Sequence, residues 1–401
     1  MRLIILMLAI GLIGCGHNPP AAGEDSPDIS GLAERNNRFA FDLYQQLSPD
    51  HDNILFSPYS LFNALAMTLA GADGNTEKQM EMTLSADMGK RRLFAAFSAM
   101  NKATNEMNRQ PGISVLCANG IWTQAGHPFK KAFLKRAAGD FDAEIRQVDF
   151  VTGFEYQRQQ INAWVEDKTK HKIEDLLPAG VPDPQTRMIL VNAIYFKGDW
   201  QVPFEGQMTR EMPFWLTPDR SVNVPLMCRQ GPIRYARDEY FQMIELPYEG
   251  KNISMLVLLG HPRADIKAIG KMLTADYVNS LYQIMNEFEV RVFLPGFKVV
   301  EDYSLSDTLV NMGMTDAFDD RADFSGMNGS KGLYINDVVH KAVIEVNEKG
   351  AEAAAATGVV MRKQSAAFMG VTFKADHPFV FLIRENATGA ILFLGRLSDP
   401  I

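Results

Sequence analysis

The sequence of 401 residues lacks the motifs of the common enzyme classes. None of the patterns HExxH, GxSxG or GxxxxGK[ST] occurs, so zinc peptidases, α/β-hydrolases and P-loop nucleotidases have no signature here. An excess of positive charge is also lacking, because the formal net charge is -8. The lysines and arginines are scattered along the chain. The one basic cluster, GKRR at residues 89–92, is interpreted as a solvated helix end rather than a polyanion site. We therefore expect a protein that is not an enzyme and has no nucleic-acid partner.

Cysteine is also rare, with three in the whole chain. Cys117 and Cys228 stand in apolar or strand-like surroundings, VLCAN and PLMCR, which favours buried free thiols over a disulfide. Their spacing fits no metal site, and we expect neither a metal nor another cofactor. The third cysteine, Cys15, lies in a different context, near the N-terminus.

The N-terminal residues have the pattern of an export signal. Arg2 precedes an apolar run over residues 3–13, which is too short to span a membrane but has the length of a signal-peptide core. The run ends in Leu12-Ile13-Gly14-Cys15, which resembles a bacterial lipobox. This resemblance implies a signal peptide over residues 1–14 and a lipidated Cys15. The alternative is an ordinary secretory signal in which Cys15 is incidental.

Residues 15–30 are rich in Gly, Pro, Asp and Ser and have almost nothing to bury, so we expect a flexible tether. Together with the lipobox, this predicts an exported protein that is lipid-anchored in the bacterial cell envelope. We expect the anchor to hold the protein at the outer membrane, facing either the periplasm or the cell surface.

The remaining chain, residues 31–401, shows no second linker and no repeat, which predicts one continuous domain. Apolar residues at helical spacing predict helices over 33–47, over 60–70 after a Ser57-Pro58 cap, and over 94–107. Apolar runs predict strands over 187–196, 253–259, 290–294 and 334–346, and a hairpin that pairs 379–384 with 390–395. The fold class is therefore α+β, with large sheets.

Two polar residues interrupt the predicted strands. Asn192 lies within the apolar run 187–196, and His340 shares a strand face with Val338, Ala342 and Ile344. A buried polar group without a partner costs about 1–3 kcal/mol, so both must be hydrogen-bonded. The ordinary interpretation of His340 is a satisfied core histidine. The other is a small hydrogen-bonded lock between strands that have to separate.

An alanine-rich segment, EKGAEAAAATGVV at residues 348–360, follows the long strand near the C-terminus. Alanine favours helix, yet the neighbouring residues favour extended structure. At a period of two, one face carries only small or apolar residues, as a strand with one buried face requires. Glu348 is in phase with the preceding strand, and Gly350 allows the chain to turn back. An exposed loop, helix or linker is the alternative. The small or apolar face consists of Ala351, Ala353, Ala355, Thr357, Val359 and Met361.

Several long motifs occur in one order along the chain. They are NILFSPYS at 53–60, NAIYFKGDW at 192–200, HKA at 340–342, EKG at 348–350 and FKADHPFVF at 373–381. In these motifs the chain is similar to the serpins, and the resemblance covers residues 31–401. It implies one domain with three β-sheets, about eight or nine α-helices and an exposed reactive-centre loop over about 348–368.

The resemblance to serpins also implies a function. The loop serves as bait for serine proteases, with cysteine proteases as further targets, and the protein is a monomer. A protease attacks the loop and forms an acyl-enzyme. The freed loop then inserts into the main sheet as an extra strand and traps the protease. A non-inhibitory serpin that binds a small molecule or a surface is the alternative.

Individual residues are matched to the family's motifs. Ser57, Ser60, Asn192 and His340 match the "shutter", where the main sheet opens. At the "breach", where insertion begins, the matching residues are Trp200 and Glu348. One departure is Gly296, which follows Leu294-Pro295 where many members have a basic residue that pairs with the hinge glutamate. Lys298 lies on the same strand face and is a candidate substitute.

The cleaved bond has two candidate positions. The family's usual register, counted from Glu348, gives Gln364–Ser365. Lys363 and Arg362 suit the acidic pocket of a trypsin-like protease, which favours a cut at Lys363–Gln364. Met361 and Val360 suit chymotrypsin-, elastase- or subtilisin-like enzymes. The sequence leaves both bonds open.

Overall fold

The computed structural model describes residues 27–107, 112–126, 128–261, 265–349 and 368–401. The predicted signal peptide, Cys15 and nearly all of the predicted tether therefore lie outside the described residues. So do most of the predicted loop residues, namely Gly350, Ala351, Ala353, Ala355, Thr357, Val359, Met361, Arg362, Lys363, Gln364 and Ser365. No helix in the described ranges is both long enough and apolar enough to cross a membrane.

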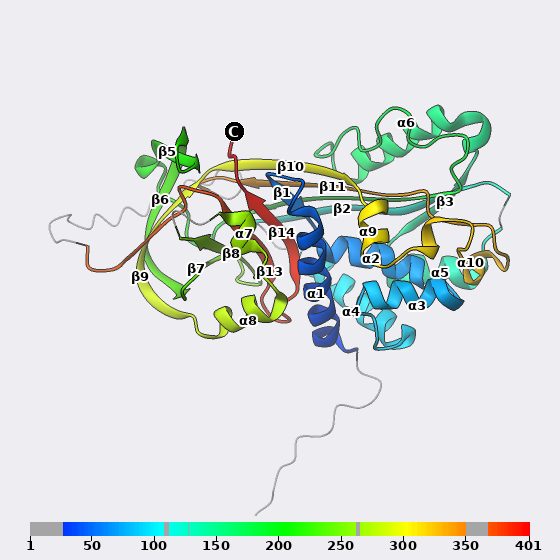
Figure 1. The fold of residues 1–401 in the computed structure, drawn as a ribbon, viewed down its shortest axis with the longest axis horizontal. Helices are drawn as coiled ribbons and strands as arrows, with labels where there is room; N and C mark the ends of the chain where they lie inside the picture. Colours follow the sequence, from blue (N-terminus) through cyan, green and yellow to red (C-terminus); the bar gives the residue numbers. More distant parts are fainter. Residues whose placement is uncertain (1–26, 108–111, 127, 262–264, 350–367) are drawn as a thin grey trace, which may run out of the picture.

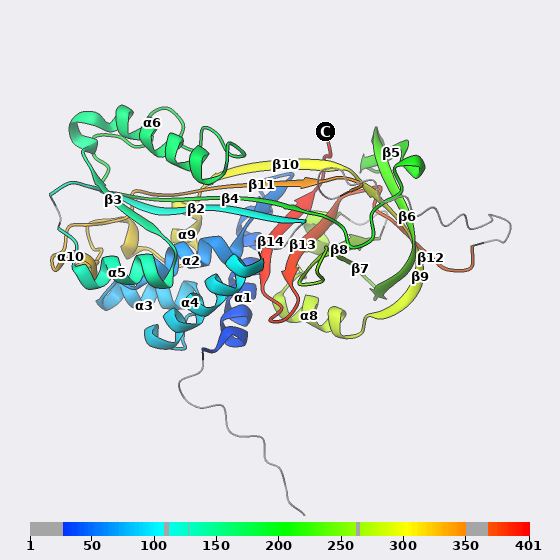
Figure 2. The ribbon, with the colours of Figure 1, turned by 180° about the vertical axis from the view of Figure 1, so that it is seen from behind.

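A five-stranded sheet runs along the length of the molecule (Figures 1 and 2). Its central pair, β11 and β4, is parallel, whereas β10 joins β11 and β2 joins β4 in antiparallel fashion. One face is covered by α6 (Phe150–Lys168), and the other by helices α2 to α5 (Figure 2). In spatial order the strands are β10 (Phe297–Ser304), β11 (Asp337–Val346), β4 (Met188–Gly198), β2 (Ile113–Gln124) and β3 (Glu144–Val148).

The other strands form one nine-stranded sheet. β6 (Arg220–Arg237) pairs with β5 (Arg210–Thr217) and β9, and then with β7 through its last residues. The described strands therefore form two hydrogen-bonded sheets where three were expected, because β6 continues from one set of strands into the next. The remaining strands, in spatial order, are β1 (Ile54–Phe56), β14 (Ile391–Leu397), β13 (Phe379–Glu385), β8 (Ile253–Gly260), β7 (Phe241–Pro247), β9 (Asn286–Pro295) and β12 (Val371–Lys374).

The described residues include ten α-helices, slightly more than the eight or nine expected, because α7 (Ile266–Gly270) and α10 (Ser325–Asn328) are single turns. Helix α1 begins at Ile29, so the last two residues of the predicted tether are helical. The other helices are α1 (Ile29–Leu47), α2 (Pro58–Leu69), α3 (Gly74–Thr83), α4 (Lys90–Met107), α5 (Lys131–Asp140), α8 (Ala275–Gln283) and α9 (Ser306–Asn311), with short 3-10 helices η1 (Gly206–Met208) and η2 (Asp316–Phe318).

Helix α2 is the buried helix beneath the five-stranded sheet. The hydroxyl of Ser57 accepts a hydrogen bond from the backbone N–H of Ser60, and Pro58 occupies the first helical position. Every residue of α2 is buried, and so are all but one of β4. The cap predicted at Ser57-Pro58 and the doubly buried strand are thus confirmed, and they bring the start of α2 against the middle of the sheet.

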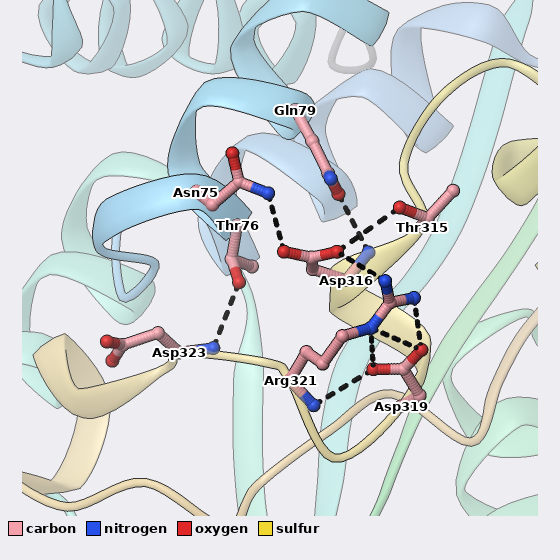
Figure 3. A network of polar contacts seen from close by, with 8 residues as sticks. All are labelled: Asn75, Thr76, Gln79, Thr315, Asp316, Asp319, Arg321 and Asp323. Atoms are coloured by element: carbon pink, nitrogen blue, oxygen red, sulfur yellow. Dashed lines mark hydrogen bonds and ion pairs between the residues drawn. The ribbon is translucent and has the colours of Figure 1, made fainter.

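A polar network fixes the segment that leads into β11 (Figure 3). The side chain of Asn75 in α3 donates to a carboxylate oxygen of Asp316 at 2.6 Å, and the backbone N–H of Asp316 donates to Gln79 at 2.7 Å. Arg321 forms an ion pair with Asp319 at 2.5 Å. These contacts anchor the connection between α9 and β11 to α3.

Candidate functional site

The parallel strands β11 and β4 form the centre of the site. They are paired over eight residues, from Asp337 opposite Ile189 to Ile344 opposite Phe196. Parallel strands end at the same edge of a sheet. The described chain continues from β11 only to Lys349 and resumes at Phe368, whose ring lies 4.4 Å from the guanidinium carbon of Arg291 in β9. A segment that turned back after β11 would run antiparallel to both central strands.

His340 and Asn192 lie opposite each other in the middle of this pair. Nδ1 of His340 is 2.7 Å from Oδ1 of Asn192, and the backbone N–H of Ser57 donates to Nε2 of His340 at 3.1 Å. Because Nε2 accepts a hydrogen bond, the ring proton resides on Nδ1 and is donated to Asn192. Burial lowers the pKa of His340 to about 3, although the hydrogen bond to Asn192 acts in the opposite direction. The imidazole is therefore neutral at physiological pH.

The start of α2 completes this hydrogen-bonded group. Nδ2 of Asn192 donates to Oγ of Ser60 at 2.6 Å and to its carbonyl oxygen at 3.2 Å. The hydroxyl of Ser57 donates to the carbonyl of Leu392 in β14 at 2.6 Å. The structure thus brings together the four residues matched to the shutter. We call Ser57, Ser60, Asn192 and His340 the lock.

The side chains of Tyr303 and Cys117 also contact the lock, and neither contact was predicted from the sequence. The ring of Tyr303 in β10 stacks on His340 with the centroids 6.4 Å apart, and its hydroxyl accepts from the N–H of Leu55 at 3.2 Å. Sγ of Cys117 in β2 lies 3.3 Å from Oγ of Ser60. A signal for Tyr303 was present, because it is in phase with the buried Phe297 and Val299 of the same strand.

The exposure of Cys117 differs from the expectation of a buried thiol. Both described cysteines are free, but only Cys228 is buried. Cys117 opens into a cavity of about 80 Å³ that is also lined by Tyr59, Asn119 and Phe141. The walls of this narrow space keep water from the thiol, and this desolvation raises the pKa of Cys117 to about 11. No cluster of three or more metal-ligating side chains occurs among the described residues.

The two residues matched to the breach lie where the described chain leaves β11. Nε1 of Trp200 donates to the carbonyl of Asn347 at 2.8 Å, and its ring stacks on Tyr248 with a centroid distance of 4.4 Å. The carboxylate of Glu348 accepts from the hydroxyl of Thr209 at 2.9 Å. The end of β11 is thus fastened to the segments that follow β4.

The suggested pairing of Lys298 with Glu348 is wrong. Lys298 instead forms an ion pair with Glu345 at 3.7 Å, and Lys197 approaches the same carboxylate at 3.9 Å. The reason is register, because Lys298 lies directly opposite Glu345 across β10 and β11. The carboxylate of Glu348 therefore has a neutral partner, the hydroxyl of Thr209.

Comparisons with known proteins agree with this architecture. Residues 34–400 match the family model described as "Serpin (serine protease inhibitor)". Serpin B3 of Homo sapiens is 38% identical over 93% of this chain and 100% of its own length, and leukocyte elastase inhibitor of Bos taurus is 39% identical over 92% and 99%. The crystal structure of uncleaved ovalbumin is 29% identical and superimposes with a TM-score of 0.83, covering 92% of this chain and 100% of ovalbumin.

The match to the family covers nearly the whole described chain, and the fold agrees with that of solved members. This confirms the α+β fold expected from the motifs. Members of the family are protease inhibitors rather than enzymes. The chain belongs to the serpin family.

Proposed function

We propose that the protein is a suicide-substrate inhibitor of serine proteases, with cysteine proteases as further targets. The catalytic oxygen or sulfur of the protease attacks a loop carbonyl between Lys349 and Phe368 and forms an acyl-enzyme. The amine released becomes a new N-terminus on the segment that leads to β12. The loop segment attached to β11 then enters the five-stranded sheet before the acyl bond is hydrolysed.

The observation that carries this proposal is the parallel pair at the centre of the sheet. A strand that starts at the end of β11 and turns back can enter between β11 and β4 and run antiparallel to each. It would replace one parallel ladder with two antiparallel ladders, which are slightly more stable per residue. The lock does not oppose this with a buried charge, because its members are neutral and joined only by hydrogen bonds.

The class of target protease rests on two arguments. The relative from Bos taurus is named an elastase inhibitor, which supports serine proteases as partners. In the loop of this chain, Arg362 and Lys363 favour a trypsin-like enzyme, whereas Val360 and Met361 suit elastase- or subtilisin-like enzymes. The bond cut would be Lys363–Gln364 or Gln364–Ser365.

We also propose that Cys15 carries the lipid that anchors the exported protein in the cell envelope, as its lipobox-like context suggests. Wild-type protein should partition into detergent and carry acyl mass at its N-terminus. A Cys15→Ala variant should be unprocessed or soluble. A fully soluble wild type that is cleaved elsewhere would contradict the anchor.

The inhibitory function is tested with trypsin, elastase and subtilisin at equimolar protein. We expect complexes that survive denaturant with at least one of them. The released C-terminal fragment should begin at Gln364 or Ser365. Its mass would distinguish these two starts and so assign the bond that is cut. Cleavage without any stable complex, across the whole panel, would favour the non-inhibitory alternative.

A further inference from the structure

The carboxamide of Asn119 in β2 has no hydrogen-bond partner in the described part of the chain. Asn119 is 6% exposed, and neither its Oδ1 nor its Nδ2 is paired. An unpaired buried polar group costs about 1–3 kcal/mol. The residue lines the same cavity as Ser60 and Cys117, so its carboxamide lies directly beside the lock.

Asn119 lies directly opposite Asn192, in the antiparallel register of β2 and β4. Both side chains lie on the α2 face of the sheet, because Asn192 bonds Ser60 and Asn119 lines the cavity that Ser60 also lines. Opposed residues in antiparallel strands have Cβ atoms about 4.5–5.5 Å apart. A side-chain rotation therefore suffices to bring the two carboxamides within hydrogen-bonding distance.

In the closed sheet Asn192 makes three side-chain hydrogen bonds, and Asn119 takes part in none of them. Nδ2 of Asn192 donates to Ser60, and its Oδ1 accepts from His340. When β11 separates from β4, Oδ1 loses that donor, because His340 belongs to β11 and Asn192 to β4. Asn119 remains beside Asn192, since β2 and β4 stay paired along eleven residues from Ile113 to Thr123.

We propose that Asn119 is a positioning residue for Asn192 during sheet opening. Its Nδ2 donates to Oδ1 of Asn192 as His340 withdraws, so the opened sheet contains a hydrogen bond that the closed sheet lacks. This new hydrogen bond lowers the free energy of the opened state relative to that of the closed state. This inference rests on the loop insertion proposed above.

The test compares Asn119→Leu, which has nearly the same volume but no amide, with Thr123→Val. Thr123 lies on the same face of β2, is fully buried and also has an unpartnered hydroxyl among the described residues, but it faces Met188 rather than the lock. Removing an unpaired polar group should stabilise both intact proteins. Only the Asn119 variant should open more slowly, because only Asn119 changes partners.

Opening is measured as the rate at which intact protein takes up a synthetic N-acetylated peptide of residues 350–361. We expect Asn119→Leu to be about tenfold slower than wild type, the change that about 1.4 kcal/mol produces in a rate. Thr123→Val should stay within about twofold of wild type. Uptake by Asn119→Leu at the wild-type rate would overturn the proposed role of Asn119 but would leave the insertion mechanism untouched. A wild type that takes up no peptide would instead overturn the insertion mechanism together with this inference.

A second measurement uses the His340→Ala background, in which Asn192 has already lost its donor. There the carboxamide of Asn119 should bond Asn192 even in the closed sheet. Asn119→Leu should therefore lower the unfolding midpoint in this background, although it raises the midpoint in the wild type. The same sign in both backgrounds would contradict the exchange of partners.

Discussion

The two sheets each enclose a polar side chain with no exposed surface, His340 in the five-stranded sheet and Arg396 in the nine-stranded sheet. The hydrogen bond from His340 to Asn192 crosses from one strand to its neighbour. The bonds of Arg396 instead tie β14 to the segment after α1. Its Nε donates to the carbonyl of Asp52 at 2.9 Å, and its Nη1 donates to Oγ of Ser48 at 2.6 Å.

The proposed function requires the five-stranded sheet to open while the nine-stranded sheet stays intact, and this difference fits that requirement. A neutral imidazole loses only a few hydrogen bonds when its strands separate, and each is worth about 0.5–1.5 kcal/mol net. A guanidinium keeps its charge at every relevant pH and must keep its acceptors wherever it is buried. We therefore expect changes at Arg396 to affect every state of the protein, and changes at the lock to affect mainly the intact state.

The largest effect among point variants is expected for Arg396→Leu. It leaves several carbonyl groups without a donor and should lower the free energy of unfolding by about 3–5 kcal/mol. Loop-cleaved protein should lose about as much as intact protein, because the hydrogen bonds of Arg396 do not depend on the state of the five-stranded sheet. Denaturant unfolding of both forms measures this. A loss confined to the intact form would erase the distinction between the two sheets.

The largest effect on inhibition is expected for Ala353→Arg or Ala355→Arg. If these side chains enter the sheet, an arginine must be buried without a partner, which slows insertion. Deacylation is then faster than insertion. The variant becomes a substrate that is cut, and active protease is released. The matched control is Ala354→Arg on the opposite face, which should inhibit almost as well as wild type. Equal inhibition by all three variants would show that the alternating face is not buried.

An effect that is smaller for each pH unit follows from the pKa of His340. Its value of about 3 in the folded protein lies below the ordinary 6.5, so between these values the unfolded state binds more protons. Stability should be fully present above about pH 6.5 and should fall with decreasing pH by at most about 1.4 kcal/mol per unit.

The His340→Gln variant should have a flatter profile between pH 6.5 and 3. His171→Asn, which removes an exposed histidine, serves as the control and should retain the wild-type slope. The unfolding midpoint in denaturant, measured across this range, gives both slopes. Identical profiles for wild type and His340→Gln would mean that the lock does not titrate.

Elements with a strong local signal could be predicted from the sequence. The Ser57-Pro58 cap and the apolar run of β4 depend on neighbouring residues, so both were located correctly. The stacking of Tyr303 on His340 and the partner of Glu348 depend on which distant segments pack together. Such contacts depend on how separate strands and loops pack against one another, which residue spacing alone does not reveal.

The N-terminal anchor and the reactive bond are a different case, because they lie outside the described residues. The lipidation of Cys15 and the choice between Lys363–Gln364 and Gln364–Ser365 stay predictions. Both depend on recognition by other proteins, a processing enzyme and a target protease. The sequence of this chain contains only one side of that recognition.

We propose that the intact protein is held in a state that is not its most stable one. The most direct measurement is a thermal melt of intact protein against protein nicked between Met361 and Ser365 by a protease that it does not trap. Insertion would add backbone hydrogen bonds at about 0.5–1.5 kcal/mol each and bury Val359 and Met361. We predict that the nicked protein melts at a markedly higher temperature. An unchanged or lower melting temperature would contradict loop insertion.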